Sequence, residues 1–109
     1  TGFNPEVGFW EKPLQEALEA EGLAPVPQFP VNQYRLDLAF PDAPAPLDIE
    51  VDGELYHKEL DGSRCRADVI RDMRLMGLGW KVKRFWVYEV RDEMDPCVSE
   101  IKDALAERN

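Results

Sequence analysis

The sequence has no long hydrophobic run and none of the features of a secreted precursor. Because no apolar stretch approaches the roughly 20 residues that span a bilayer, we expect no membrane segment. The start, TGFNPEVGFWEK, lacks a basic segment followed by an apolar one, which argues against a signal peptide and favours a cytoplasmic protein. The start also lacks an initiating Met, which we interpret as an excised domain or as Met removal before Thr1.

Cysteine and histidine are scarce. The chain has two cysteines, Cys65 and Cys97, and one histidine, His57, with no CxxC and no Cys/His spacing typical of zinc sites. This argues against a structural zinc ion. We expect two free buried thiols, as in a cytoplasmic protein, rather than a disulfide.

Positive charge is also in deficit, with 13 Lys and Arg against 22 Asp and Glu and a net charge of −9. Alone, this argues against non-specific adhesion to nucleic acid, which needs basic residues to neutralise phosphates. A metal-using nuclease remains compatible, because its site needs clustered carboxylates and the divalent ion supplies the positive charge. With 44% hydrophobic and 32% charged residues, the 109-residue chain fits one globular domain.

Apolar residues at helical spacing predict three helices, over residues 9–21, 63–77 and 95–106. Their apolar faces comprise Trp10, Leu14, Ala17 and Leu18, then Val69, Ile70, Met73 and Met76, then Cys97 or Val98, Ile101 and Leu105. We expect Gly22 to close the first helix, and Ser63 and Asp95 to cap the starts of the other two. Pro13 must lie in the first turn or kink its helix.

Alternating apolar and polar residues predict strands over 34–40 and 47–52, joined as a hairpin by the loop PDAPAP. Residues 80–90 are apolar on both faces, which suits a central strand covered on both sides. The proline-rich residues 23–33 fit a connector or an edge strand. The predicted order is therefore α-(β)-β-β-α-β-α, an α/β sandwich on a small mixed sheet.

The stretch LDIEVDGELYHKE nearly matches the calcium loop of an EF-hand, D-x-[DN]-x-[DN]-G-x5-E. The matching positions are Asp48, Glu50, Asp52, Gly53 and Glu59. The context argues against this interpretation, because the preceding FPDAPAPL is too rich in proline to be the helix that must enter the loop. The β-branched residues between the acids are typical of a strand instead.

On a strand, Glu50 and Asp52 project from the same face, and Asp37 lies on the polar face of the preceding strand. Paired strands lie about 4.8 Å apart, so Asp37 and Glu50 can approach closely. Carboxylates that close raise one another's pKa, a cost that proteins accept at a cation site. Mg²⁺ uses one or two carboxylates and keeps waters, which leaves room for a phosphate. The alternative is the solvated face of a two-stranded sheet.

His57 follows Asp52 by five residues and has the near-neutral pKa of a general acid or base. It could equally bond the leaving phosphate group or be an exposed loop histidine. The basic candidates for phosphate contacts are Arg64, Arg66, Arg71 and Arg74 on the following helix, then Lys81, Lys83 and Arg84. The helix arginines could instead pair with nearby aspartates, which we favour for Arg74.

Four segments in order, YRLDLAF, LDIEVDGELYH, RADVIRDMRLMGLGWKVKRFW and CVSEIKDAL, resemble the small restriction-endonuclease-like domains of the PD-(D/E)XK superfamily. The branch to which they are most similar is that of the very-short-patch-repair endonuclease, often found as a terminal domain on helicase-containing proteins. The resemblance covers a core of about 9–106 within a single domain, 1–109. It implies a three-layer α/β/α sandwich.

By this resemblance, Asp37 corresponds to the metal-binding aspartate of the second core strand and Glu50 to the acid of the (D/E)XK element. Glu11 matches an acid that the superfamily often places on the first helix near the metal. The lysine of (D/E)XK is replaced by Asp52. The missing lysine leaves three options: a second metal held by Asp52, a substitute from His57 or Lys81, or a weakened enzyme.

Other matches extend the implied site. His57 matches the histidine after the V-D-G turn, Asp68 and Arg71 match the D-x-x-R of the following helix, and Arg84 matches the arginine of the long strand. The resemblance thus implies Mg²⁺ as cofactor, with Mn²⁺ able to substitute, and DNA as partner. A fused or associated helicase or ATPase is a further expected partner.

We therefore predict a metal-dependent DNA endonuclease in which a metal-activated water hydrolyses the phosphodiester. The predicted metal ligands are Glu11, Asp37, Glu50 and Asp52; the catalytic residues are Asp37, Glu50, Asp52 and His57; the DNA-phosphate contacts are Arg64, Arg71, Lys81 and Arg84. One alternative is a weak or inactive nuclease-like domain that docks DNA within a larger helicase, defence or repair protein. An RNA-directed nuclease is another.

Overall fold

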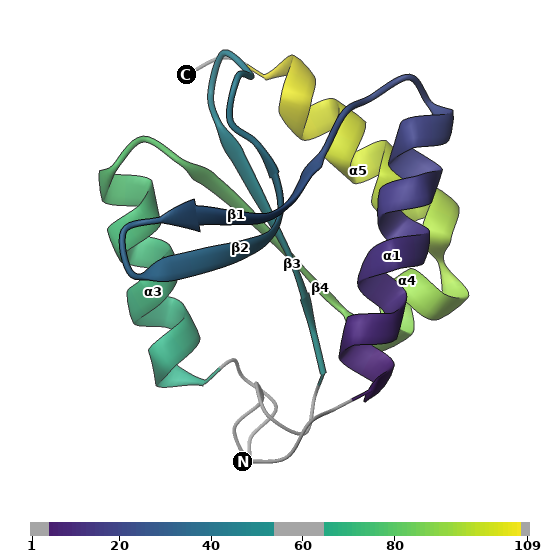
Figure 1. Cartoon of the computed structure of the whole chain (residues 1–109), viewed down its shortest axis with the longest axis horizontal. Coiled ribbons are helices and arrows are strands. Elements are labelled where there is room, and N and C mark those ends of the chain that lie inside the picture. Colours follow the sequence, from purple (N-terminus) through teal and green to yellow (C-terminus); the bar gives the residue numbers. More distant parts are fainter. Residues whose placement is uncertain (1–4, 54–64, 108–109) are drawn as a thin grey trace.

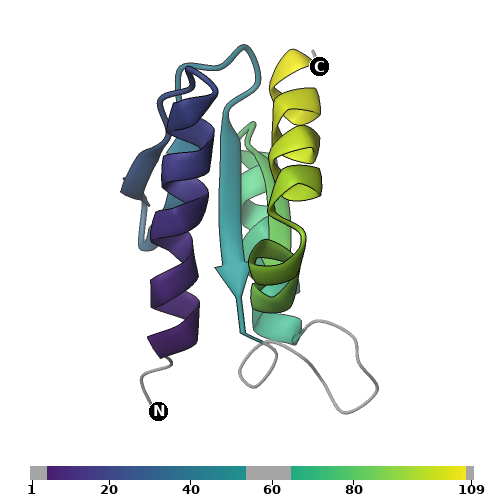
Figure 2. The same ribbon diagram turned by 90° about the vertical axis from the view of Figure 1, so that its right-hand side faces the viewer.

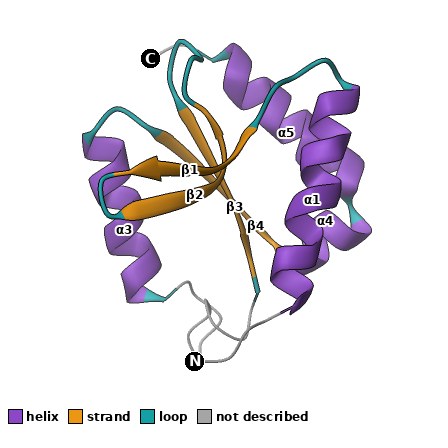
Figure 3. Ribbon diagram, in the orientation of Figure 1, coloured by secondary structure: helices purple, strands orange, loops and turns teal. Residues whose placement is uncertain are grey.

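The computed structural model describes residues 5–53 and 65–107, and in the first helix it describes side chains from Phe9 onward. The elements follow the predicted order, with one short helix added after the last strand (Figures 1 and 3). They are α1 (Pro5–Ala20), β1 (Val26–Val31), β2 (Tyr34–Phe40), β3 (Leu47–Asp52), α3 (Arg66–Gly77), β4 (Lys81–Trp86), α4 (Val87–Asp92) and α5 (Met94–Ala106). None of these helices is long and apolar enough to cross a membrane.

The four strands form one mixed sheet in the order β1-β2-β3-β4. β1, β2 and β3 pair antiparallel, and β3 pairs with β4 in parallel. Leu38 lies opposite Ile49 at the last ladder position between β2 and β3, and Ile49 lies opposite Lys83 on the other side. The hairpin and the edge strand predicted from the sequence are confirmed.

Helices cover both faces of the sheet. α3 stands alone on one face, and α1, α4 and α5 gather on the other (Figures 1 and 2). The main core lies on the three-helix side and includes Leu14, Leu18, Ile49, Val51 and Ile101. A smaller cluster of Leu36, Ala39 and Leu75 lies on the α3 side with Trp80 and Val82. The architecture is the predicted α/β sandwich, and β3 at its centre is buried along its whole length.

The long strand predicted over 80–90 is too long. β4 ends at Trp86, where the Glu89 side chain accepts a hydrogen bond from the Trp86 N–H (2.9 Å) and starts α4. This contact satisfies a donor that the start of a helix leaves unpaired. β4 is also an edge strand rather than a central one, although helices cover both of its faces.

Helix boundaries differ from the prediction in detail. α1 begins earlier, so Pro13 lies inside it, and Gly22 (φ 81°) closes it as expected. α5 begins at Met94, which puts Asp95 in its first turn rather than at the cap. Ser63 lies outside the described residues. Cys65 and Cys97 are free, as predicted, but Cys65 is only half-buried whereas Cys97 is buried.

The apolar face predicted for α3 points away from the sheet. Asp68 and Leu75 are its buried residues, whereas Val69, Ile70, Met73 and Met76 are exposed. The helix therefore turns its polar side inward, toward the charged residues of β3 and β4.

The alternation predicted for β2 breaks at Asp37. Leu38 and Phe40 lie in the main core, but Leu36 lies in the smaller cluster on the opposite side. Gln28 on the neighbouring strand has a left-handed backbone (φ 53°) and falls at the same level in the register. The β1–β2 pair thus twists sharply where Asp37 projects.

Candidate functional site

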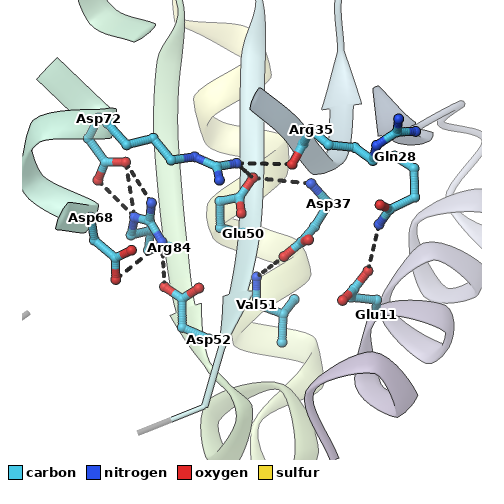
Figure 4. A network of polar contacts seen from close by, with 11 residues as sticks. Glu11, Gln28, Arg35, Asp37, Glu50, Val51, Asp52, Asp68, Asp72 and Arg84 are labelled. Carbon is cyan, nitrogen blue, oxygen red and sulfur yellow. Dashed lines mark hydrogen bonds and ion pairs between the residues drawn. The ribbon is translucent and has the colours of Figure 1, made fainter. Parts of the chain in front are cut away.

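The candidate site lies where β2 and β3 separate (Figure 4). Beyond the Leu38–Ile49 pair, carboxylates take the place of the backbone ladder. The N–H of Asp37 donates to Glu50 Oε2 (3.1 Å), and the N–H of Val51 donates to Asp37 Oδ2 (2.9 Å). Each acid is thereby fixed by the opposite strand, with Asp37 and Glu50 held side by side as predicted.

Glu11 approaches the same place from α1. It lines a hollow of about 300 Å³ with Asp37 and Gln28, and its Oε1 accepts a hydrogen bond from Gln28 Nε2 (3.2 Å). Burial and the charge of Asp37 raise the pKa of Glu11 to about 7. Three elements, α1, β2 and β3, thus bring one acid each to the place where β2 and β3 separate (Figure 4).

The carboxylates are held at an electrostatic cost. Burial, followed by the charge of Glu50, raises the pKa of Asp37 to about 7. Burial and Asp48 raise the pKa of Glu50, and the Arg71 guanidinium offsets part of this shift. Like charges gathered in a desolvated place are relieved by protons or by a bound cation.

Arg71 is the basic residue that α3 brings to these acids. Its Nη2 donates to Glu50 Oε2 (3.1 Å) and to the Arg35 carbonyl (3.0 Å), and its guanidinium lies over the Tyr34 ring at 5.1 Å. The side chain remains 23% exposed. An arginine so placed can still present N–H groups to a phosphate.

Asp52 lies two residues along the same face of β3, but it turns to Arg84. Arg84 Nη1 donates to Asp52 Oδ2 (2.7 Å), and its Nε and Nη2 donate to Asp72 (2.8–3.0 Å). Asp68 lies 3.8 Å from the same guanidinium. Burial alone would lower the pKa of Arg84, but the bonds to Asp72 and Asp52 outweigh it and raise the pKa.

The Arg84 cluster affects two predicted roles. The Arg84 side chain is only 5% exposed and is engaged by carboxylates from β3 and α3, so its predicted contact with DNA phosphate has no support in this geometry. Asp52 is held by a cation of the protein itself. Its predicted roles at a metal and in catalysis stay predictions.

The other predicted basic residues lie elsewhere. Lys81 is at the start of β4, opposite Leu47, where its Nζ donates to the Ala104 carbonyl at the end of α5 (2.7 Å). It is therefore not brought to the carboxylates. His57 and Arg64 fall outside the described residues, and their predicted roles stay predictions.

One residue of this region was missed. Asp48, named in the sequence only as a position of the calcium loop, is fully buried, and neither of its carboxylate oxygens has a hydrogen-bond partner. Burial raises its pKa, and a proton on the free oxygen of Glu50 would give it the donor that the ionised pair lacks. Sequence reasoning could have found this residue, because a strand that is covered on both faces buries its acidic side chains as well as its apolar ones.

The fit of a metal ion can be judged from these donors. Among residues 5–53 and 65–107, no three Asp, Glu, His or Cys side chains form a closed metal cage. Asp37 and Glu50 instead form an open pair of hard oxygen donors beside Glu11. Mg²⁺ and Mn²⁺ accept such sites, with one or two carboxylates and the remaining positions left to water and phosphate. The residues present therefore fit an open divalent site.

The mixed sheet between helices, with acids gathered where two strands separate, defines a restriction-endonuclease-like domain. The family model REase_MTES_1575 matches residues 10–105, so the chain belongs to this restriction-endonuclease-like family. No curated protein sequence matches the chain.

Proposed function

We propose that this domain is a metal-dependent DNA endonuclease whose reaction centre is the Asp37–Glu50 pair. The observation that carries the proposal is the exchange of backbone-to-carboxylate hydrogen bonds between β2 and β3. It fixes one oxygen of each acid at the position where a cation relieves their repulsion. Membership of a restriction-endonuclease-like family supports the nuclease class.

When bound, a divalent ion would supply a Lewis acid that activates water and stabilises charge on the phosphate. Asp37 and Glu50 would hold it, and Glu11 would add negative charge at the rim of the site. Arg71 would orient the phosphate, since its guanidinium already lies against Glu50 and is partly open to solvent. Fixed donors of this kind assist because they need no reorganisation during the reaction.

The test is a cleavage assay with the purified domain and Mg²⁺ or Mn²⁺ on linear, nicked, branched and single-stranded DNA, with RNA as competitor. We expect metal-dependent cleavage of DNA that drops about 100-fold or more in Asp37→Asn and Glu50→Gln. Asp42→Asn, on the exposed turn after β2, is the matched control and should cut as the native domain does. Cleavage that persists in both site variants would overturn the proposal.

A second function has its own supporting observation. Asp52, which stands where the family pattern has lysine, is paired with Arg84, which fits a domain that binds DNA without cutting it. DNA binding without cleavage in every metal and substrate combination would favour this alternative. Relationship to very-short-patch-repair enzymes and attachment to a helicase remain parts of the proposal, as does a cytoplasmic location.

A further inference from the structure

α3 is an amphipathic helix. Its polar side faces the sheet, although the sequence predicts that its apolar side would do so. Its inner side carries Asp68, Arg71, Asp72 and Leu75, spaced at i, i+3, i+4 and i+7. The first three reach the Arg84 cluster and Glu50. These contacts with Glu50 and Arg84 therefore determine which side of α3 faces the sheet.

The outer side of α3 is consequently apolar, although no described element covers it. Val69, Ile70, Met73 and Met76 are 46%, 42%, 63% and 52% exposed, and Leu78 just beyond the helix is 54% exposed. We call these five residues the outer stripe. Figures 1 and 2 show α3 alone on its side of the sheet. Contiguous exposed apolar side chains rimmed by polar ones mark interaction surfaces.

A hollow continues the outer stripe at its C-terminal end. It measures about 420 Å³, begins at Met76, and has Trp80, Val82 and Leu47 in its lining with Lys81 and Lys83. An apolar side chain of a partner that packs along the stripe would find an anchoring pocket there. Interfaces typically combine a pocket of this kind with surrounding apolar contacts.

The described charges beside the stripe and its hollow are mainly basic: Arg66 and Arg74 on α3, then Lys81 and Lys83 with one acid, Glu107, in the hollow. Arg66 is exposed before the first stripe residue, and Arg74 is exposed between Met73 and Met76, where its Nη1 also donates to the Tyr34 hydroxyl (3.1 Å). The acids of α3, Asp68 and Asp72, lie on the inner side with Arg84. In a chain with a net charge of −9, this is a local reversal of sign. A partner should therefore carry negative charge around its apolar contacts.

Two other occupants fit less well. A second copy packing α3 against α3 in antiparallel fashion would bring Arg66 of one copy toward Arg74 of the other, and like charges in an interface are costly. Nucleic acid would match the arginines, but protein–DNA interfaces are more polar than this row of Val, Ile, Met and Leu. Exposed Met and Arg are instead typical of protein interfaces.

We propose that the outer stripe, with its two arginines, is a docking surface for an acidic amphipathic helix of a partner protein. The helix would lay its apolar face along Val69, Met73 and Met76 and place acids beside Arg66 and Arg74. This is the helix-on-groove mode of recognition, read as anchors at i, i+3, i+4 and i+7. The surface lies on the side of α3 opposite Glu50, so it works independently of the nuclease site.

Two designed helical peptides of about 18 residues test the proposal by fluorescence anisotropy with the whole chain. Both carry Leu on one face; one has Glu on the flanks and the other has Lys at the same positions. We expect the Glu peptide to bind roughly tenfold or more tightly than the Lys peptide. Met73→Asp should abolish binding, whereas Phe9→Asp, a matched change at a 62% exposed site on α1, should not.

Charge reversal gives the sharper test. The double variant Arg66→Glu and Arg74→Glu should prefer the Lys peptide. Equal binding of the two peptides, no binding of either at about 1 mM, or equal loss in Phe9→Asp would overturn the proposal. So would displacement of the Glu peptide by metal-free duplex DNA, or a dimer of the free chain that Met73→Asp dissolves, because each assigns the stripe to another occupant.

Discussion

The backbone N–H of Asp37 donates to the carboxylate of Glu50, and Asp37 in turn accepts from the residue after Glu50. Two acids that repel one another are thus tied to opposite strands and cannot move apart. In a regular ladder the two acids would be near one another only because of the register. Here their carboxylates themselves accept the hydrogen bonds that join the two strands. The negative charges of Asp37 and Glu50 repel one another at this place in the sheet, and a bound divalent cation would relieve that repulsion.

The first prediction concerns pH. The folded-state pKa of Asp37 and of Glu11 is about 7, well above the value of about 4 in an unfolded chain. Between pH 5 and 8 the folded protein therefore holds more protons than the unfolded one, so the free energy of unfolding falls as pH rises. We expect a loss of about 2 kcal/mol over this range, after allowing for solvent screening of the half-buried Glu11.

Urea denaturation at pH 5, 6, 7 and 8 with EDTA measures this loss. Added Mg²⁺ or Mn²⁺ should restore stability at pH 8 and change little at pH 5, because the ion competes with the protons. A metal-free protein whose stability is flat or rises between pH 5 and 8 would contradict the account.

Asp48→Asn tests the buried orphan carboxylate. At pH 8 this substitution removes a desolvated charge and lowers the pKa of Glu50, since Asp48 contributes to the shift of Glu50. We expect a gain of about 1 kcal/mol in the free energy of unfolding, limited by the unpaired amide that remains. Asp42→Asn, on an exposed turn, is the control and should not change stability. A loss of stability at pH 8 would show that Asp48 has a compensating partner.

Arg84 is predicted to be a stability residue. Arg84→Met would leave Asp52, Asp68 and Asp72 around an apolar group, and breaking a buried pair from one side costs about 3–5 kcal/mol. Adding Asp52→Asn and Asp72→Asn should recover part of the loss. Thermal unfolding checks both steps. Lys102→Met, which removes a largely exposed pair with Glu21, should change stability little, and an equal loss there would contradict the prediction.

The sequence predicted the hairpin of β2 and β3 and the meeting of Asp37 with Glu50, because strand period and an intervening turn determine which side chains share a face. It could not predict that the ladder ends at Leu38 or that carboxylates take over its hydrogen bonds. Both features depend on the twist of the β1–β2 pair near Gln28, which has a left-handed backbone. This twist arises when the sheet packs and cannot be read from local sequence.

Helix α3 exposes the limit of apolar periodicity. Met73 and Met76 mark a face that would be expected to pack inward, but Arg71 and Asp72 have charged partners on β3 and β4 and bury the polar side instead. Local spacing does not report such distant partners. The same holds for Arg84, which the parallel register places opposite Glu50 and whose three aspartate partners come from β3 and α3.

The most direct test of the central claim is a calorimetric Mn²⁺ titration of the native domain, Asp37→Asn, Glu50→Gln and the control Asp42→Asn at pH 7.5. We predict binding of the ion to the native and control proteins with release of protons, and about 100-fold weaker binding in the two site variants with folding retained by circular dichroism. Undiminished Mn²⁺ binding in Asp37→Asn and Glu50→Gln would contradict the account.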